Sequence, residues 1–234
     1  MRIADVRPQL QRALSMKTLE EMLSPDRQAF AADPFGYSAL AWQKWAIAQS
    51  LAGLRTDPEA APTSYDLKSP VLWLTQAHAL SEAAASVLRG HPELDHLPLP
   101  IRGICDGQYC AVGLMLMGYS LEISLKAMRI IRNGVDGYQD SERKHKHHRL
   151  ADLSDFVPNL GDKDKVILRL LTHFLKWAGR YPDPGAGREA DAQSIFELSE
   201  MHQISATDLF GLAARVMGHA KILVDKPSSD VAPG

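Results

Sequence analysis

The sequence predicts an all-α protein. Apolar residues recur at spacings of three and four over several long segments, which is the period of a helix with one buried face. The alternating apolar pattern of β-strands is nearly absent. At 234 residues and 45% hydrophobic, the chain is long enough to bury one substantial core and to carry an appendage.

Two serine–proline pairs predict the starts of the first helices. Ser24-Pro25 and Ser69-Pro70 each place a capping hydroxyl before a proline, the residue that suits the first helical turn. The second pair opens a helix that runs to Gly90. Its apolar face consists of Trp73, Leu74, Ala77, Leu80, Ala84, Val87 and Leu88.

A boundary between two parts of the chain is expected in the proline-containing stretch 55–68. The part before it contains a helix over residues 37–54, which carries Trp42 and Trp45. We therefore divide the chain into an N-terminal helical extension, a helical bundle and a disordered tail: residues 1–65, 66–225 and 226–234.

The elements of the bundle that follow the helix to Gly90 can be read in order. They are a proline-rich link at 91–100, the longest helix at 108–132 with its end at Asn133-Gly134, a basic loop, a short helical turn at 150–156, a helix at 162–178, and a last helix that runs from a capping box at Ser205–Asp208 to Val224.

Composition favours a cytoplasmic protein without membrane association. The amino terminus turns polar at once and lacks the apolar region of a signal peptide. The most apolar window, Cys110 to Tyr119, is too short to span a bilayer. Cys105 and Cys110 are expected to be reduced thiols. No P-loop, nucleophile elbow or zincin motif is present, and we expect no cofactor.

The most distinctive stretch is a run of seven consecutive basic side chains from Arg143 to Arg149 in a chain whose net charge is −2. Such a run stays in solvent, and its field attracts phosphate or carboxylate. The residues expected to contact the phosphate of a nucleotide or of RNA are Lys144, Lys146 and Arg149, with Lys126 and Arg180 as further contacts.

Three other interpretations of this run stay open. Arg143 and His148 suit metal-independent RNA cleavage, in which a neutral imidazole takes the 2′-hydroxyl proton and a guanidinium stabilises charge on the phosphate. A solvated basic loop needs no ligand at all. A transition-metal site made of His145, His147 and His148 is disfavoured by the flanking cations and by the lack of a carboxylate in the run.

A polar stripe follows one side of the otherwise apolar long helix. Glu122, Lys126 and Arg129 lie four and then three residues apart, which places them on one face. The stripe is either solvated, with an intrahelical Glu122–Lys126 pair, or it lines a cleft or dimer seam where its cations meet phosphate.

Three segments, in order, carry a family resemblance. Gly118 to Ala127 (GYSLEISLKA), His148 to Leu153 (HRLADL) and Arg180 to Asp183 (RYPD) resemble the signatures of HEPN domains, the "higher eukaryotes and prokaryotes nucleotide-binding" superfamily. The resemblance covers residues 66–225.

This resemblance implies an up-and-down bundle of four to five core helices that is commonly a homodimer. Such proteins are often encoded beside a minimal nucleotidyltransferase and act in toxin–antitoxin or defence systems. Many are metal-independent ribonucleases that carry an arginine and a histidine near the start of a late core helix. Here the late helices offer only Arg169 with His173 and Arg215 with His219, each with three intervening residues. Members with the Arg-Tyr-Pro-Asp ending resemble binding or partner modules.

These observations predict a nucleotide- or RNA-phosphate-binding protein that forms a homodimer. Two alternatives accompany this prediction. One is an RNA endonuclease that uses His148 as base and Arg143 as electrostatic stabiliser. The other is an interaction scaffold for a neighbouring partner protein, which the helical extension before residue 66 suggests.

Overall fold

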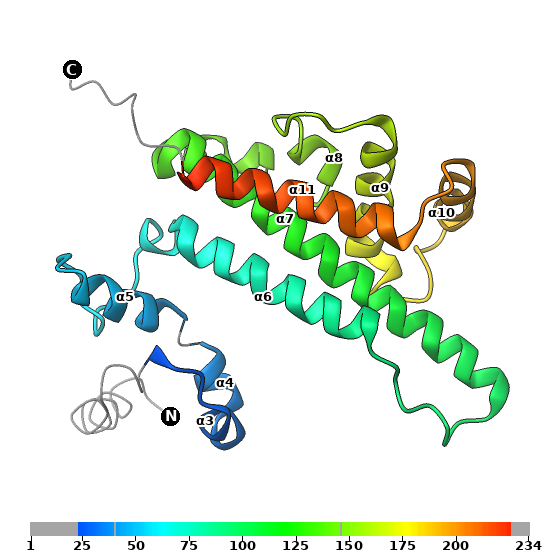
Figure 1. Ribbon diagram of the computed structural model, residues 1–234, viewed down its shortest axis with the longest axis horizontal. Helices are drawn as coiled ribbons and strands as arrows, with labels where there is room; N and C mark the ends of the chain where they lie inside the picture. Colours follow the sequence, from blue (N-terminus) through cyan, green and yellow to red (C-terminus); the bar gives the residue numbers. More distant parts are fainter. Residues whose placement is uncertain (1–22, 40, 146, 226–234) are drawn as a thin grey trace. The chain divides into compact units, whose positions relative to one another are not determined.

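The computed structural model is all-helical throughout the residues that it describes, which are 23–39, 41–145 and 147–225 (Figure 1). This confirms the predicted all-α fold. The chain divides into two compact units, Met1–Leu67 and Lys68–Gly234. The expected disordered tail lies outside the described residues.

Within its described residues, the first unit contains the short helices α3 (Arg27–Ala32), α4 (Pro34–Ser38) and α5 (Ala41–Leu51). Asp26 caps α3, because its carboxylate accepts from the backbone N–H groups of Gln28 and Ala29 at 3.1 and 2.9 Å. The predicted start at the serine–proline pair two residues earlier is therefore wrong. The helix predicted over 37–54 is present as α5, but its predicted start is wrong, since Tyr37 and Ser38 belong to α4, which a second aspartate cap, Asp33, opens.

The second unit is a bundle around one long helix, α7 (Leu99–His145) (Figure 1). This helix contacts α6, α8, α9, the π-helical turn η2 and α11. The bounds of these elements are Pro70–Arg89 for α6, Leu150–Leu153 for α8, Asp162–His173 for α9, Phe174–Ala178 for η2 and Ala206–Asp225 for α11. A further helix that the sequence did not predict, α10 (Glu189–Met201), packs against α9.

The core of this unit is formed by apolar side chains of α7, α9, η2 and α11, together with the short helix α8. Its fully buried members include Leu121, Leu125, Met128, Leu150, Leu168, Leu175, Leu212 and Val216. A buried hydroxyl also joins two helices, since Ser120 of α7 donates to the backbone carbonyl of Ala77 in α6 at 2.7 Å. At the start of α11, the predicted capping box forms. Ser205 and Asp208 exchange backbone-to-side-chain bonds of 2.8 and 3.2 Å.

The long helix does not end where the sequence predicted. Gly134 interrupts it with a φ of 71°, but the chain then resumes a helical path to His145. Burial explains the continuation, because Tyr138 is buried and packs edge-on against Trp73 of α6 with ring centroids 6.0 Å apart. Burial, and then the charge of Glu142, raise the pKa of Tyr138 to about 12.

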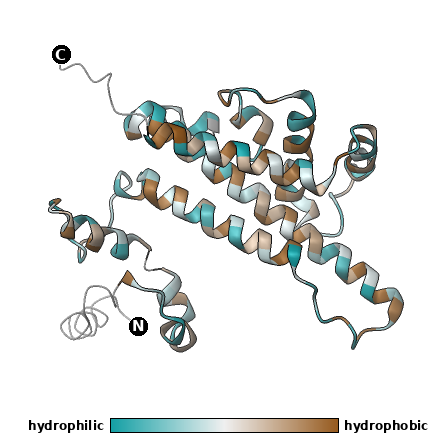
Figure 2. Cartoon of the chain, in the orientation of Figure 1, coloured by the Kyte–Doolittle hydropathy of each residue, from teal (hydrophilic) through white to brown (hydrophobic). Residues whose placement is uncertain are grey.

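This continuation corrects the predicted basic loop. The first three residues of the basic run, Arg143 to His145, form the end of α7. Cations are favourable there because the last helical turn exposes the partial negative charge of its carbonyls. At its other end α7 begins at Leu99, earlier than predicted. The first turns of the helix contain hydrophobic residues, drawn in brown (Figure 2). Ile104, in this part, is exposed.

One described segment, Leu99–Lys144, is long and apolar enough to pass a length-and-composition test for a membrane span. Half of its most apolar window is buried inside the protein. Core helices of soluble proteins pass the same test, so the cytoplasmic location stays a prediction.

Gly179, directly after η2, lies so close to α7 that a side chain would not fit between them. A Cβ atom there would lie 2.4 Å from the Cβ of Met115 and 3.0 Å from the carbonyl oxygen of Ala111, both in α7. Backbone and rigid Cβ atoms give way poorly, so this contact needs a glycine.

We therefore expect Gly179→Ala to lower the free energy of unfolding by about 1–3 kcal/mol through overpacking. Gly218→Ala is the matched control, because a Cβ atom added to that helical glycine would meet no other atom within 4 Å, and alanine should stabilise α11 by up to about 1 kcal/mol. Urea denaturation measures both. Equal effects of the two substitutions would contradict the close approach.

Candidate functional site

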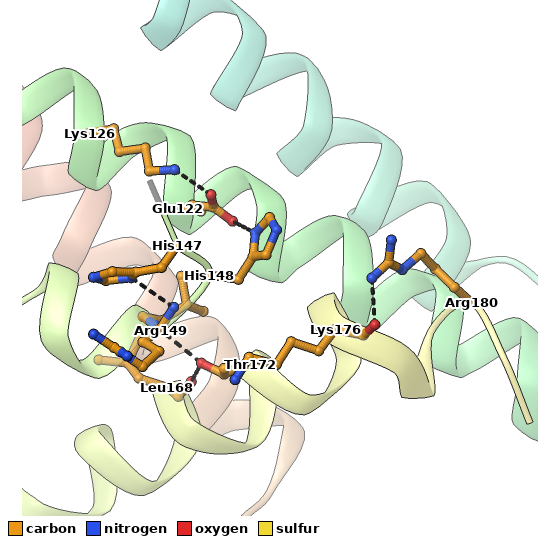
Figure 3. Close-up of polar contacts among 10 residues, drawn as sticks. Glu122, Lys126, His147, His148, Arg149, Leu168, Thr172, Lys176 and Arg180 are labelled. Carbon is orange, nitrogen blue, oxygen red and sulfur yellow. Dashed lines mark hydrogen bonds and ion pairs between the residues drawn. The ribbon is translucent and has the colours of Figure 1, made fainter. Parts of the chain in front are cut away.

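The candidate site is organised around the carboxylate of Glu122. This residue lies in the middle of α7 and is 4% exposed. One carboxylate oxygen accepts from the Nζ of Lys126 at 2.6 Å, and the other lies 2.8 Å from the Nδ1 of His148 (Figure 3). A buried carboxylate needs such partners, because an uncompensated charge in the interior is costly.

The contact with Glu122 fixes the orientation of the His148 ring. An ionised carboxylate can only accept, so Nδ1 must carry the hydrogen, and in the neutral ring Nε2 then carries the lone pair. Tyr119 packs edge-on against the same ring, with centroids 6.1 Å apart. The His148 side chain is 44% exposed. Glu122 thus orients the imidazole, and Nε2 is the nitrogen that can accept a proton.

The polar stripe of α7 is not solvated, so that part of the prediction is wrong. Its intrahelical Glu122–Lys126 pair is present, but Arg129 faces the next segment of the chain. The Arg129 guanidinium donates to the carbonyl of Leu153 at 3.2 Å and to Asp155 at 2.7 Å, and lies 4.9 Å from the ring centroid of Phe156. The stripe therefore holds the segment that follows the basic run.

A second anchor ties the same segment to α9. The backbone N–H of Leu150 donates to the hydroxyl of Thr172 at 3.1 Å, and that hydroxyl donates to the carbonyl of Leu168 at 2.8 Å (Figure 3). The segment 147–150, which we call the basic turn, is thus fixed to α7 through His148 and to α9 through Leu150.

Two further residues of the basic turn have partners within or beside it. Arg149 pairs with Asp152 at 2.5 Å in an exposed position. The backbone N–H of Arg149 donates to the Nδ1 of His147 at 3.2 Å. Burial, and then the charge of Arg149, lower the pKa of His147, so this ring is held neutral more strongly than a free histidine.

The structure brings together only some of the predicted site residues. Lys126 and His148 meet on Glu122, whereas Arg143 and Lys144 are exposed at the end of α7 and have no ion pair within the described part of the chain. No contact joins Arg143 to His148 among the described residues. Lys146 lies outside the described residues, as does the side chain of His145.

Arg180 lies apart from this cluster, beyond Lys176 (Figure 3). Its guanidinium donates to the backbone carbonyl of Lys176 and lies 5.6 Å from the ring centroid of Tyr181. Sequence reasoning missed the anchoring role of Thr172 and the pairing of Glu122 with His148. The only signal of the latter was an acid on an otherwise apolar helix.

Metal ligation is not favoured by the described side chains. No group of three or more histidine, cysteine, aspartate or glutamate side chains among them is suited to hold a metal ion. Cys105 and Cys110 are free thiols.

No family model matches the chain, and no curated protein or solved structure is significantly similar to it. The function is therefore argued from the site.

Loss of the Glu122 charge should destabilise the protein. In Glu122→Gln, the half-buried Lys126 loses its counter-charge, and we expect the free energy of unfolding to fall by about 2–3 kcal/mol. Asp152→Asn, which breaks an exposed pair, should cost less than about 1 kcal/mol. Chemical denaturation measures both.

The double variant Glu122→Gln/Lys126→Met provides a further control. It removes the unpaired cation and should recover at least half of the lost stability. A double variant no more stable than Glu122→Gln would show that the charge pair is not the source of the effect.

Proposed function

We propose that this protein binds the phosphate groups of RNA through the end of α7 and the basic turn. The observation that carries the proposal is the contrast within the basic run. His148 is tied to a buried carboxylate, whereas Arg143 and Lys144 remain exposed without an ion pair in the described residues. A fixed turn beside free cations is suited to an anionic ligand, because little ordering of the backbone is needed on binding.

The charges around the basic turn favour an anionic ligand over a neutral one. Lys126 and Glu122 compensate each other, and Arg149 is compensated by Asp152. Around the basic turn, the described cations without an ion pair are therefore Arg143 and Lys144, at the end of α7. Their local field attracts phosphate although the net charge of the chain is −2. Lys126 is a weaker phosphate ligand than the sequence suggested, because its ammonium already binds Glu122.

The resemblance to HEPN domains supports the same class of ligand and suggests the kind of cellular system in which the protein acts. On that resemblance we propose a cytoplasmic homodimer of a toxin–antitoxin or defence system, with a nucleotidyltransferase-type partner. These proposals rest on the Gly118–Ala127, His148–Leu153 and Arg180–Asp183 segments.

A titration with single-stranded RNA at several salt concentrations tests the proposal. Affinity should fall steeply as salt rises, because bound phosphates release counterions. In Arg143→Gln/Lys144→Gln, the slope of log K against log salt should decrease by about 1.4, which is about 0.7 for each lost phosphate contact. Arg89→Gln/Lys221→Gln, which changes cations elsewhere, is the matched control. Binding that is indifferent to salt would contradict the proposal.

A second candidate function, metal-independent RNA cleavage, is favoured by the Glu122–His148 pair. The Nε2 of His148 would take the proton of a 2′-hydroxyl, whose oxygen attacks the adjacent phosphorus while the 5′-oxygen leaves with a proton returned by the imidazolium. Glu122 holds the required tautomer and stabilises the imidazolium. The stabilising cation would be Arg143 or Arg149, both exposed.

Cleavage assays in the presence of a chelator test this candidate. His148→Ala should abolish cleavage, and Glu122→Gln should reduce the rate by at least about 100-fold at saturating RNA. The 2′,3′-cyclic phosphate product, detected by mass spectrometry, identifies the reaction. Undiminished cleavage by a folded His148→Ala variant would remove this histidine from the mechanism.

A further inference from the structure

A row of exposed cations continues from the basic turn along the next helix. Arg169, Lys176 and Arg180 follow the surface of α9 and η2. None of the three forms an ion pair with a carboxylate in the described part of the chain. The basic turn docks at Thr172, between the first and the second of them. The row therefore lies next to the proposed phosphate site.

The geometry of the helix keeps these side chains on one side. Arg169 and Lys176 are seven residues apart, which corresponds to about two helical turns. After the π-helical turn, the Arg180 guanidinium lies beside this segment, because it donates to the backbone carbonyl of Lys176 (Figure 3).

At its far end the row meets a hollow of about 540 Å³. One wall is formed by residues of the first turns of α7, and the segment 177–182 forms the other. The α7 residues are Gly103, Ile104, Gly107, Gln108, Ala111 and Val112. A hollow of this size is in the range of pockets that enclose small ligands.

One aromatic side chain of the hollow is exposed enough to stack on a planar base. Tyr181 is 59% exposed, and the Arg180 guanidinium lies 5.6 Å from its ring centroid. Trp177 is 8% exposed, and its indole N–H has no acceptor within the described residues. The nearby carboxylate of Asp183 is turned toward the backbone N–H of Gly185, which donates to it at 2.6 Å.

We infer that the α9–η2 row and this hollow bind single-stranded RNA. The phosphates lie on Lys176 and Arg180, and one unpaired base enters the hollow and stacks on Tyr181. Aromatic platforms beside cations bind single strands without requiring a sequence, because every base has a flat face. A duplex is excluded, since its bases are paired and stacked inside the helix. The inference rests on the proposed function and extends it to a second, base-binding part of the site.

Binding of the full chain to a 12-nucleotide single-stranded RNA and to a 12-base-pair RNA duplex tests the inference. The unmodified protein should prefer the single strand by at least about tenfold. Tyr181→Ala should weaken single-strand binding by about tenfold, whereas Tyr181→Phe, which keeps the ring, should bind as the unmodified protein does. Lys176→Gln/Arg180→Gln should reduce the salt slope by about 1.4 and leave duplex binding unchanged.

The outcomes separate this inference from the proposed function. If Tyr181→Ala and Lys176→Gln/Arg180→Gln bind the single strand normally while Arg143→Gln/Lys144→Gln does not, the row and the hollow are not part of the site and the proposed function stands. If the unmodified protein binds neither RNA, both fail. Thermal melting of each variant checks that these exposed substitutions leave the fold intact.

Discussion

The buried carboxylate of Glu122 is the interaction on which the candidate site depends. A charge in the interior of a helical bundle is tolerated only with partners, and Glu122 has two, one from its own helix and one 26 residues later. The second partner, His148, belongs to the basic turn, which Leu150 also ties to Thr172 of α9. The need of the buried carboxylate for a second partner therefore contributes to the fixed position of the basic turn.

The consequences of that anchor extend along the surface. His148 contacts Glu122 of α7, and Leu150 contacts Thr172 of α9. The basic turn is therefore fixed to two core helices. It joins the cations at the end of α7 to those of α9 and η2. In the sequence, the basic run resembles a flexible loop that attracts anions. In the structure, its described residues are part of an ordered surface. The contact with Glu122 also selects the tautomer of His148 that leaves Nε2 able to accept a proton. The same arrangement is therefore compatible with phosphate binding and with proton transfer.

The sequence predicted the bundle helices that bury an apolar face and missed α10, which has no buried residue. The buried side chains of α9 and α11 recur at helical spacing, whereas α10 has no buried residue and gave no such signal. Gly134 does leave the helical conformation, but the predicted end of the helix there is wrong, because a local signal does not show that Tyr138 packs on Trp73 and carries the helix onward. For the site, the basic run was visible in the sequence. The Glu122–His148 pair was not, because no local spacing relates two residues so far apart.

We propose that RNA lies on the end of α7, on the basic turn and along η2. Chemical-shift mapping of the ¹⁵N-labelled protein with a 12-nucleotide single-stranded RNA tests this most directly. We expect backbone signals of Arg143–Leu150 and Lys176–Tyr181 to shift together at one saturating concentration, and those of Lys163 and Asp208, an ion pair on other parts of the bundle, to stay in place. Shifts confined to other helices, or none at all, would contradict the claim.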